Sequence, residues 1–222
     1  MCKSAVVFDL DGTLLNTLDD LTTSTNYALA AFGLPSRSTA EVRSFVGNGI
    51  RNLIRLAVPA GSSEQLVEEV HATFDAHYAA HHLDATRPYE GVPQVVAHLR
   101  EAHVPCCVVS NKGDYAVQPL VEHFFGGLFS VACGEREQDG IRRKPWPDTV
   151  LACLDAVGCA PERSIYVGDS EVDLQTARNA GMPCVIVTWG FRDEQLLRDN
   201  GARILVHTPA QLESVLLDMV RG

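Results

Sequence analysis

Ala5-Val6-Val7-Phe8-Asp9-Leu10-Asp11-Gly12-Thr13 is the stretch that decides how this chain folds. Its first four residues are continuously apolar, as in a strand buried on both faces, and two carboxylates follow at once. Asp9 and Asp11 stand two positions apart on extended backbone and so project to the same side, while Gly12 allows a tight turn. One carboxylate could be a nucleophile and the other an acid or base, or both could hold a hard cation. A solvated acidic turn is the alternative.

Five more short apolar runs follow, and amphipathic helical patterns separate most of them. The runs are residues 105–109, 128–132, 164–167, 183–187 and 203–206. Helical spacing of apolar residues is clear in 92–99, 150–157 and 212–219. Strands that alternate with helices form a parallel sheet with helices on both faces. The sequence therefore predicts a doubly wound, Rossmann-like α/β fold.

One long segment, residues 17–84, breaks this rhythm because it holds helical patterns and no convincing strand. Ser38 and Glu41 have the spacing of a capping box, and Ser62 or Ser63 begins the last helical pattern. Two glycines interrupt the middle pattern. We therefore expect a helical insert at residues 17–84, placed on an α/β core formed by residues 1–16 and 85–222.

Composition and charge exclude several classes of protein. The 222 residues are 46% hydrophobic and 21% charged, as in a globular chain, and the net charge of −10 would repel nucleic acid. No stretch approaches the roughly 20 apolar residues that span a bilayer, and the first apolar run is too short for a signal peptide. We expect a cytoplasmic protein with no nucleic-acid or membrane partner. Seven cysteines without a CxxC pair are expected to be reduced thiols.

Three further polar clusters follow predicted strands or begin predicted helices. Ser110-Asn111-Lys112 follows the second apolar run, and a hydroxyl with the next main-chain amides can bind phosphate oxygens. Lys144 lies in a basic stretch before a helix, where an ammonium could neutralise a phosphoryl group. Asp169 and Asp173 follow the fourth run and add carboxylates at the same edge of the sheet.

Together these clusters resemble the four signature motifs of the haloacid dehalogenase superfamily of phosphotransferases. The matching positions span essentially the whole chain and are Asp9-x-Asp11-Gly12-Thr13, Ser110, Lys144 and Gly168-Asp169-x-x-x-Asp173. The helical insert after the first motif looks like that superfamily's small α-helical cap. Residues 46–49, 109–112, 144–147 and 187–190 resemble, more narrowly, the phosphoglycolate phosphatases. Gly113 departs from that narrower pattern, since many relatives have proline after the lysine.

The resemblance implies Mg²⁺-dependent hydrolysis of a small phosphomonoester, with 2-phosphoglycolate as the best single candidate. Asp9 would attack phosphorus and form an aspartyl-phosphate. Asp11 would protonate the leaving alkoxide and then take a proton from water. Ser110, Lys144 and main-chain amides near Asp11 and Asn111 would bind the phosphoryl oxygens.

The resemblance also implies how Mg²⁺ would be held. Its ligands would be the Asp9 carboxylate, the Asp11 main-chain carbonyl and Asp169. Asp173 would hold in place either the metal and its ligands or Lys144, without contacting the substrate itself. Thr13 would orient Asp11.

Specificity is expected to come from the insert. Gly47 and Asn48 are candidates for close contact with the substrate. Two glycines within a helical pattern lower the stability of the helix, and close approach of the backbone to a small ligand would explain that cost. Asn48 and Arg51 could reach a substrate carboxylate or hydroxyl. The alternatives are that the two glycines only kink the helix, that Asn48 only forms a turn, and that Arg51 is a solvated helix residue. The only partner expected is a small phosphate ester, with the chain acting as a monomer or homodimer.

Two rival functions remain open from the sequence. A β-phosphoglucomutase-like mutase would share the core, the two aspartates and the cap. A non-catalytic phosphoryl-binding protein would share an aspartate, a serine and a lysine at strand ends. The retained Asp11 disfavours the second rival, and the glycine-bracketed segment 46–49 disfavours the first.

Overall fold

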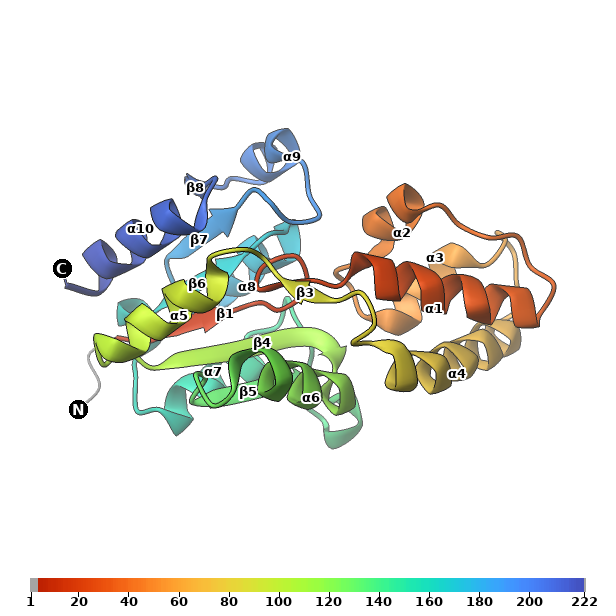
Figure 1. The fold of residues 1–222 in the computed structure, drawn as a ribbon, viewed down its shortest axis with the longest axis horizontal. Helices are drawn as coiled ribbons and strands as arrows, with labels where there is room; N and C mark the ends of the chain where they lie inside the picture. The colour runs from red at the N-terminus through yellow and green to blue at the C-terminus, as the bar shows by residue number, and fades with distance from the viewer. Residues whose placement is uncertain (1–3, 222) are drawn as a thin grey trace.

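A six-stranded parallel sheet forms the body of the protein in the computed structural model, which describes residues 4–221 (Figure 1). Its strand order is β5-β4-β1-β6-β7-β8, so the first strand of the chain lies in the middle. The strands are β1 (Val6–Phe8), β4 (Cys106–Gly113), β5 (Val131–Glu135), β6 (Ile165–Gly168), β7 (Cys184–Val187) and β8 (Ile204–Val206). The predicted Rossmann-like α/β class is confirmed.

Helices cover both faces of this sheet because alternate residues of the buried strands point to opposite faces. Val6 and Phe8 pack in one apolar cluster with α5 (Val92–Glu101), α6 (Asp114–Phe125) and α10 (Pro209–Arg221). Val7 packs on the other face with α7 (Asp148–Ala156) and α8 (Glu171–Ala180). The remaining helical elements of this body are α9 (Glu194–Asp199) and two 3₁₀ turns, η1 (Glu137–Asp139) and η2 (Pro161–Arg163).

Two strands differ from their predicted bounds by more than one residue. β5 begins at Val131 rather than at residue 128, because Gly126 and Gly127 end α6 with positive φ and the next residues pack on the core as a loop. β4 runs to Gly113, four residues beyond its predicted end, with an irregularity between Val109 and Gly113. The Ser110-Asn111-Lys112 cluster therefore lies within a buried strand rather than after it.

The helical segment consists of four helices with an apolar core of their own. They are α1 (Leu18–Ala31), α2 (Thr39–Phe45), α3 (Ile50–Ala57) and α4 (Glu64–His81). Ser38 and Glu41 form the expected capping box at α2, and Ser63 caps α4. The middle helical pattern is split into α2 and α3, with residues 46–49 between them.

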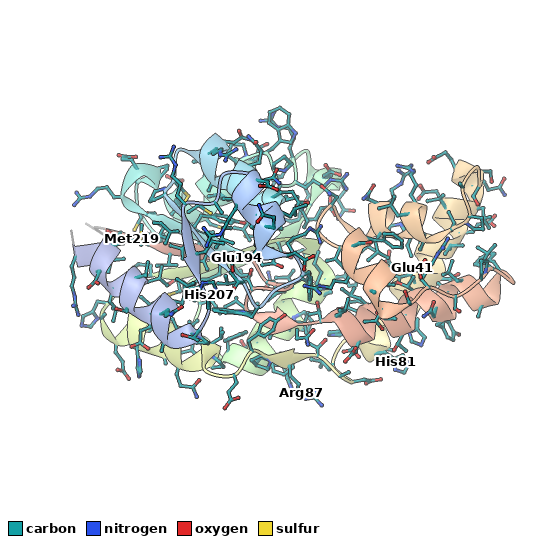
Figure 2. All side chains as sticks on the ribbon, turned by 90° about the horizontal axis from the view of Figure 1, so that it is seen from above. Glu41, His81, Arg87, Glu194, His207 and Met219 are labelled. Atoms are coloured by element: carbon teal, nitrogen blue, oxygen red, sulfur yellow. The ribbon has the colours of Figure 1, made fainter. Side chains whose placement is uncertain are left out.

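The chain enters and leaves this helical segment through a small antiparallel sheet formed by β2 (Leu15–Asn16) and β3 (Arg87–Pro88). The Asp20 carboxylate on α1 accepts hydrogen bonds from Ala85 and Thr86 on the returning chain. Seen from above, Glu41 and His81 lie on the helical segment, Glu194 and Met219 on the α/β body, and Arg87 at the junction (Figure 2). We propose residues 17–84 as a cap domain and residues 1–16 and 85–222 as the core.

The described residues include no helix with the length and apolar character needed to cross a membrane. Five cysteines are free: Cys106, Cys107, Cys133, Cys153 and Cys184. Cys159 is disulfide-bonded, so the expectation of reduced thiols is wrong at this position. Cys2 lies outside the described residues.

Candidate active site

Two aspartates lie side by side at the carboxyl edge of the sheet because the strands that precede them are neighbours. Asp9 follows β1 and Asp169 follows β6, and the main-chain N–H of Asp9 donates to the carbonyl of Val167 at 2.9 Å. Asp173 reaches the same place from the first turn of α8. Each of the three offers a carboxylate oxygen within 4.8 Å of the others, and all are buried. The structure thus brings together the carboxylates that the sequence analysis placed at this edge.

Lys144 enters this cluster from the loop before α7. Its ammonium nitrogen lies 2.8 Å from Oδ1 of Asp9 and 2.9 Å from Oδ1 of Asp173. The Asp173 carboxylate is also held by four other donors: the Tyr166 hydroxyl, the main-chain N–H groups of Asp169 and Ser170, and the Ser170 hydroxyl. Both oxygens of Asp173 are therefore engaged by protein donors, which suits a support for Lys144 better than a metal ligand.

Burial controls the protonation of these groups. Burial and the Asp173 carboxylate raise the pKa of Asp9 well above its ordinary value, although Lys144 opposes the shift. Burial and Asp173 likewise raise the pKa of Asp169 to about 7. Burial alone would lower the pKa of Lys144, but Asp173 and Asp9 hold that pKa above its ordinary value. Three carboxylates with one ammonium leave excess negative charge in a buried site, and this excess favours a bound cation.

The surroundings of Asp169 fit a hard divalent cation. The main-chain N–H of Phe191 donates to Oδ2 of Asp169 at 2.6 Å and fixes the carboxylate. A Cβ atom at Gly12 or Gly190 would overlap this carboxylate, so both glycines make room for it. Buried carboxylate oxygens at this spacing are the ligand type that Mg²⁺ prefers.

The histidines of the cap do not supply a second metal group. Across residues 4–221, the three aspartates are the only set of His, Cys, Asp or Glu side chains arranged to hold an ion. Nδ1 of His77 lies 3.0 Å from the Ser24 hydroxyl, and Nδ1 of His81 lies 2.8 Å from Asp84. Both histidines therefore contact polar groups of the helical segment itself.

Ser110 and Asn111 approach the carboxylates from β4. Both are buried and line the same cavity as Asp9 and Asp169. The side-chain amide of Asn111 donates to the carbonyls of Lys144 and Gly47, each at 3.0 Å. The Asn111 side chain therefore connects the basic loop and the cap to β4. The sequence analysis expected only main-chain amides near Asn111 to take part, as donors to phosphoryl oxygens.

Asp11 points toward the cap side of the cavity. Its Oδ1 accepts a hydrogen bond from the Thr17 hydroxyl at 2.7 Å and lies 3.1 Å from the ammonium nitrogen of Lys112. Thr17, and not Thr13, is therefore the threonine in contact with Asp11. Lys112 stood within a quoted motif but received no role from the sequence; a lysine three residues after the continuously apolar run 105–109 was the available signal.

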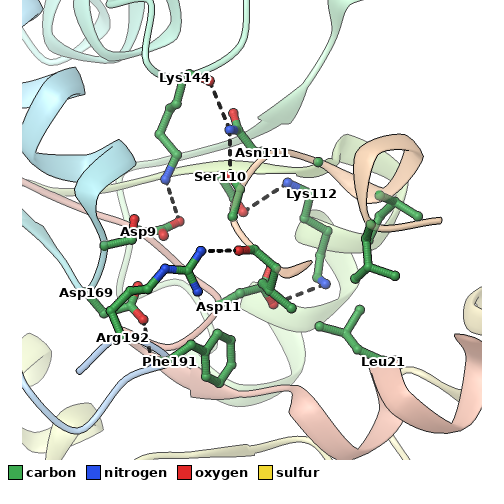
Figure 3. Close-up of a pocket in the computed structure, with 16 residues that line it drawn as sticks. Asp9, Asp11, Leu21, Ser110, Asn111, Lys112, Lys144, Asp169, Phe191 and Arg192 are labelled. Carbon is green, nitrogen blue, oxygen red and sulfur yellow. Dashed lines mark hydrogen bonds and ion pairs between the residues drawn. The ribbon is translucent and has the colours of Figure 1, made fainter. Parts of the chain in front are cut away.

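A cavity lies between the core and the cap (Figure 3). Its core side is lined by Asp9, Asp11, Ser110, Asn111, Lys112, Lys144, Asp169, Ser170, Phe191 and Arg192, and its cap side by Leu21, Val46, Gly47, Gly49, Ile50 and Leu53. Gly47 is thus placed at the cavity as expected. Asn48 and Arg51 are not among the lining residues, and Arg51 instead forms ion pairs with Glu64 and Glu68.

Two arginines that the sequence analysis missed join the cap to the core. Arg192 of the core donates to the carbonyls of Arg43 and Val46 at the end of α2, at 3.2 and 2.6 Å. Arg43 of the cap donates in return to the carbonyls of Gly190 and Phe191, at 3.1 and 2.8 Å. These exchanged contacts hold segment 46–49 over the cavity. Nothing in the local sequence of either arginine indicates this pairing.

Comparisons with known proteins agree with this arrangement. A family model described as haloacid dehalogenase-like hydrolase matches residues 6–187. A phosphoglycolate phosphatase from Xanthomonas campestris pv. campestris is 34% identical over 213 residues, which cover 94% of each chain. An N-acetylmuramic acid 6-phosphate phosphatase from Pseudomonas aeruginosa is 31% identical and covers 97% of this chain and 96% of its own. The crystal structure of a presumed phosphoglycolate phosphatase from Lactobacillus delbrueckii subsp. bulgaricus has a TM-score of 0.89 at 35% identity, covering 97% and 99%.

Proposed function

The chain belongs to the haloacid dehalogenase-like hydrolase family and is a phosphoric monoester hydrolase, and on that premise we propose that it cleaves a small phosphomonoester with Mg²⁺ and an aspartyl-phosphate on Asp9. The best single substrate candidate is 2-phosphoglycolate. The observation that carries the proposal is the contact of 2.8 Å between Lys144 Nζ and Asp9 Oδ1 at the floor of the cavity. That contact supports the proposal because it joins the carboxylate proposed as the nucleophile to the cation proposed to bind the phosphoryl group.

In the first step a carboxylate oxygen of Asp9 attacks phosphorus as the bond to the leaving oxygen breaks. Lys144, the Ser110 hydroxyl and nearby main-chain N–H groups bind the phosphoryl oxygens, where negative charge spreads. Asp11 gives its proton to the leaving alkoxide. Thr17 and Lys112, which contact Asp11 Oδ1, position this carboxyl group.

In the second step water attacks the aspartyl-phosphate and Asp11 takes a proton from that water. The carboxylate of Asp9 and inorganic phosphate are then restored. The cap covers the cavity during transfer, which keeps bulk water from the phosphoryl group.

Asp9, Asp169 and the Asp11 main-chain carbonyl would hold Mg²⁺, with Asp173 behind Lys144. When bound, the ion would neutralise the charge shared by these carboxylates and the phosphoryl oxygens. The raised pKa values of Asp9 and Asp169 support this assignment, because burial and the nearby Asp173 carboxylate both disfavour the ionised form, a cost that a bound cation would relieve.

Two relatives support a substrate whose leaving alcohol carries a carboxylate. Their names describe phosphate esters of glycolate and of N-acetylmuramic acid, and both of these alcohols are carboxylic acids. A substrate that carries a carboxylate on its alcohol is therefore the class we favour for this chain.

We further propose that the enzyme works in the cytoplasm as a monomer or homodimer. Light scattering on the purified protein would decide between monomer and homodimer.

A phosphate-release screen tests the proposal. It includes 2-phosphoglycolate, N-acetylmuramic acid 6-phosphate, β-glucose 1-phosphate and p-nitrophenyl phosphate, each with Mg²⁺ and with EDTA. We expect Mg²⁺-dependent turnover of p-nitrophenyl phosphate and the highest kcat/KM for 2-phosphoglycolate. Formation of glucose 6-phosphate instead of free phosphate would favour the mutase, and no turnover of any ester would favour the phosphoryl-binding rival.

A further inference from the structure

Lys112 is a buried cation in the cavity with unused capacity to donate hydrogen bonds. Its side chain is 1% exposed and lines the cavity. Its ammonium nitrogen lies 3.1 Å from Asp11 Oδ1, yet it makes no hydrogen bond of good geometry in the structure. A buried ammonium group without full hydrogen bonding is costly, so the group is suited to receive an acceptor from a ligand.

The other two cations of the cavity are already engaged. Lys144 contacts Asp9 and Asp173. Arg192 is paired with Glu171 at 2.9 Å and donates to cap carbonyls. Lys112 thus has fewer protein acceptors than either of them: it has one carboxylate neighbour, Asp11, and no hydrogen bond of good geometry.

Tyr78 of α4 stands beside Lys112. The ammonium nitrogen lies 4.6 Å from the centre of the Tyr78 ring, and the buried Tyr78 hydroxyl has no hydrogen-bond partner in the structure. Burial raises the pKa of Tyr78 to about 12, so this hydroxyl stays protonated and able to donate. The Tyr78 side chain therefore packs against the Lys112 ammonium group, although Tyr78 itself is not among the residues that line the cavity.

The rest of the cap side of the cavity presents no charged or polar side chain. Its side chains are apolar or absent: Leu21, Val46, Gly47, Gly49, Ile50 and Leu53. Ser110 and Lys112 lie two residues apart on β4 and line the same cavity. Both side chains therefore border the space in which a phosphate ester would bind.

We propose that Lys112, with the Tyr78 hydroxyl beside it, binds the carboxylate of the leaving group and selects phosphate esters of small hydroxy acids. This inference rests on the proposed function and names the substrate feature that the same site recognises. Lys112 is a specificity residue in this scheme: its ammonium group pairs with the substrate carboxylate, while the phosphoryl group is held by Ser110 and Lys144.

The test uses two phosphonates that the enzyme cannot cleave. 3-Phosphonopropionate carries a carboxylate where 3-hydroxypropylphosphonate carries a neutral hydroxymethyl group. Their dissociation constants are measured by calorimetry with Mg²⁺ present, for the wild type, Lys112→Met, Tyr78→Phe and Arg55→Met. Arg55 is the matched control, because it is an exposed cap cation paired with Glu64, away from the cavity.

We expect the wild type to bind the carboxylate compound about 10- to 100-fold more tightly than its neutral partner, as for a hydrogen bond between charged groups. Lys112→Met should remove most of this preference and change binding of the neutral compound much less. Lys112→Gln provides a second variant if Lys112→Met fails to fold. Tyr78→Phe should reduce the preference several-fold, and Arg55→Met should leave it unchanged.

An unchanged preference in Lys112→Met, or equal binding of both compounds by the wild type, would overturn the proposal. Equal weakening of both compounds in Lys112→Met would show a structural role in cap closure and would overturn it as well. These results do not depend on turnover. Failure of the carboxylate assignment is therefore separable from failure of the hydrolase proposal, which the phosphate-release screen tests.

Discussion

Lys144 Nζ lies 2.9 Å from Asp173 Oδ1, and this pairing separates the roles of the two aspartates in the Gly168–Asp173 motif. Asp173 is fully buried and is engaged by donors at both oxygens. Asp169 is fixed mainly by the Phe191 N–H and keeps a carboxylate face toward Asp9. Asp173 therefore holds Lys144, and Asp169 is available to hold an ion.

This difference predicts that substitution of Asp173 lowers kcat, whereas substitution of Asp169 lowers the affinity for Mg²⁺. Asp173→Asn should lower kcat by about 10- to 100-fold at saturating Mg²⁺, because Lys144 loses a charged support. Its Mg²⁺ affinity should change little. Asp169→Asn should weaken Mg²⁺ binding at least about tenfold. Calorimetric titration with Mg²⁺ measures the affinities; equal weakening in both variants would restore Asp173 as a ligand.

Asp9→Asn should abolish turnover without unfolding the protein. An amide is a poor nucleophile and a poor Mg²⁺ ligand, and its shape preserves the packing around Lys144. We expect phosphate release below roughly a hundredth of wild type, with a thermal midpoint that stays close to it. Asp155→Asn removes an exposed carboxylate on α7 and is the matched control. Activity retained by Asp9→Asn would rule out this residue as the nucleophile.

Asp11→Asn should affect substrates according to their leaving groups. The main-chain carbonyl is kept, but the proton donor is lost, and general acid catalysis contributes about 10² to 10⁴ in rate. An alkyl phosphate such as 2-phosphoglycolate should therefore lose far more than p-nitrophenyl phosphate, whose leaving group needs little protonation. Single-turnover rates measure the difference. Equal losses on both substrates would argue against Asp11 as the general acid.

Stabilisation by Mg²⁺ should depend on pH. In the metal-free protein burial raises the pKa of Asp169 from 3.8 to about 7, so the folded state binds this proton more tightly than the unfolded state. The associated stability is fully present below about pH 4 and is lost as the pH rises toward 7. Mg²⁺ needs the deprotonated carboxylate, so its stabilising effect should grow over the same range.

Thermal midpoints between pH 5 and 8, with Mg²⁺ and with EDTA, measure this effect. We expect the shift caused by Mg²⁺ to be smallest near pH 5 and largest above pH 7. Asp169→Asn serves as the control and should reduce the dependence, to which Asp9, whose pKa is also raised, still contributes. A shift of constant size across this range would contradict the assignment of Asp169 as the group that exchanges a proton for the ion.

Gly47 and Asn48 should differ in their effect on specificity. Gly47 has a φ of +123°, and a Cβ there would lie 3.2 Å from Nη2 of Arg192, so Gly47→Val should displace the segment held over the cavity. We expect a loss of at least about tenfold in kcat/KM for 2-phosphoglycolate, which is roughly 1.4 kcal/mol. Asn48→Ala, at the adjacent position outside the lining, should change kcat/KM by less than about threefold.

The same two variants are assayed with p-nitrophenyl phosphate, which should respond less than 2-phosphoglycolate. Thermal midpoints are recorded alongside. Parallel losses on both substrates in Gly47→Val, or a change in stability alone, would identify segment 46–49 as a helix break without a part in specificity.

The sequence by itself determined the fold class and which polar residues meet at the carboxyl edge of the sheet. Val6–Phe8 is apolar at every position, and such a run can only be buried on both faces, which requires helices on either side of a parallel sheet. Asp9, Ser110 and Asp169 then had to meet, since the carboxyl ends of parallel strands share one edge. Local patterns also located the caps of α2 and α4.

Only the tertiary structure decided which residues of the cap and of β4 face the cavity. Arg51 was a plausible substrate ligand from the sequence, but Glu64 and Glu68, on another helix, hold it at the surface. Lys112 received no role from the sequence, yet it lies buried between Asp11 and Tyr78, residues far apart in the chain. Such contacts depend on how two separately packed bodies meet, and helical or strand periodicity carries information only about the element in which it occurs.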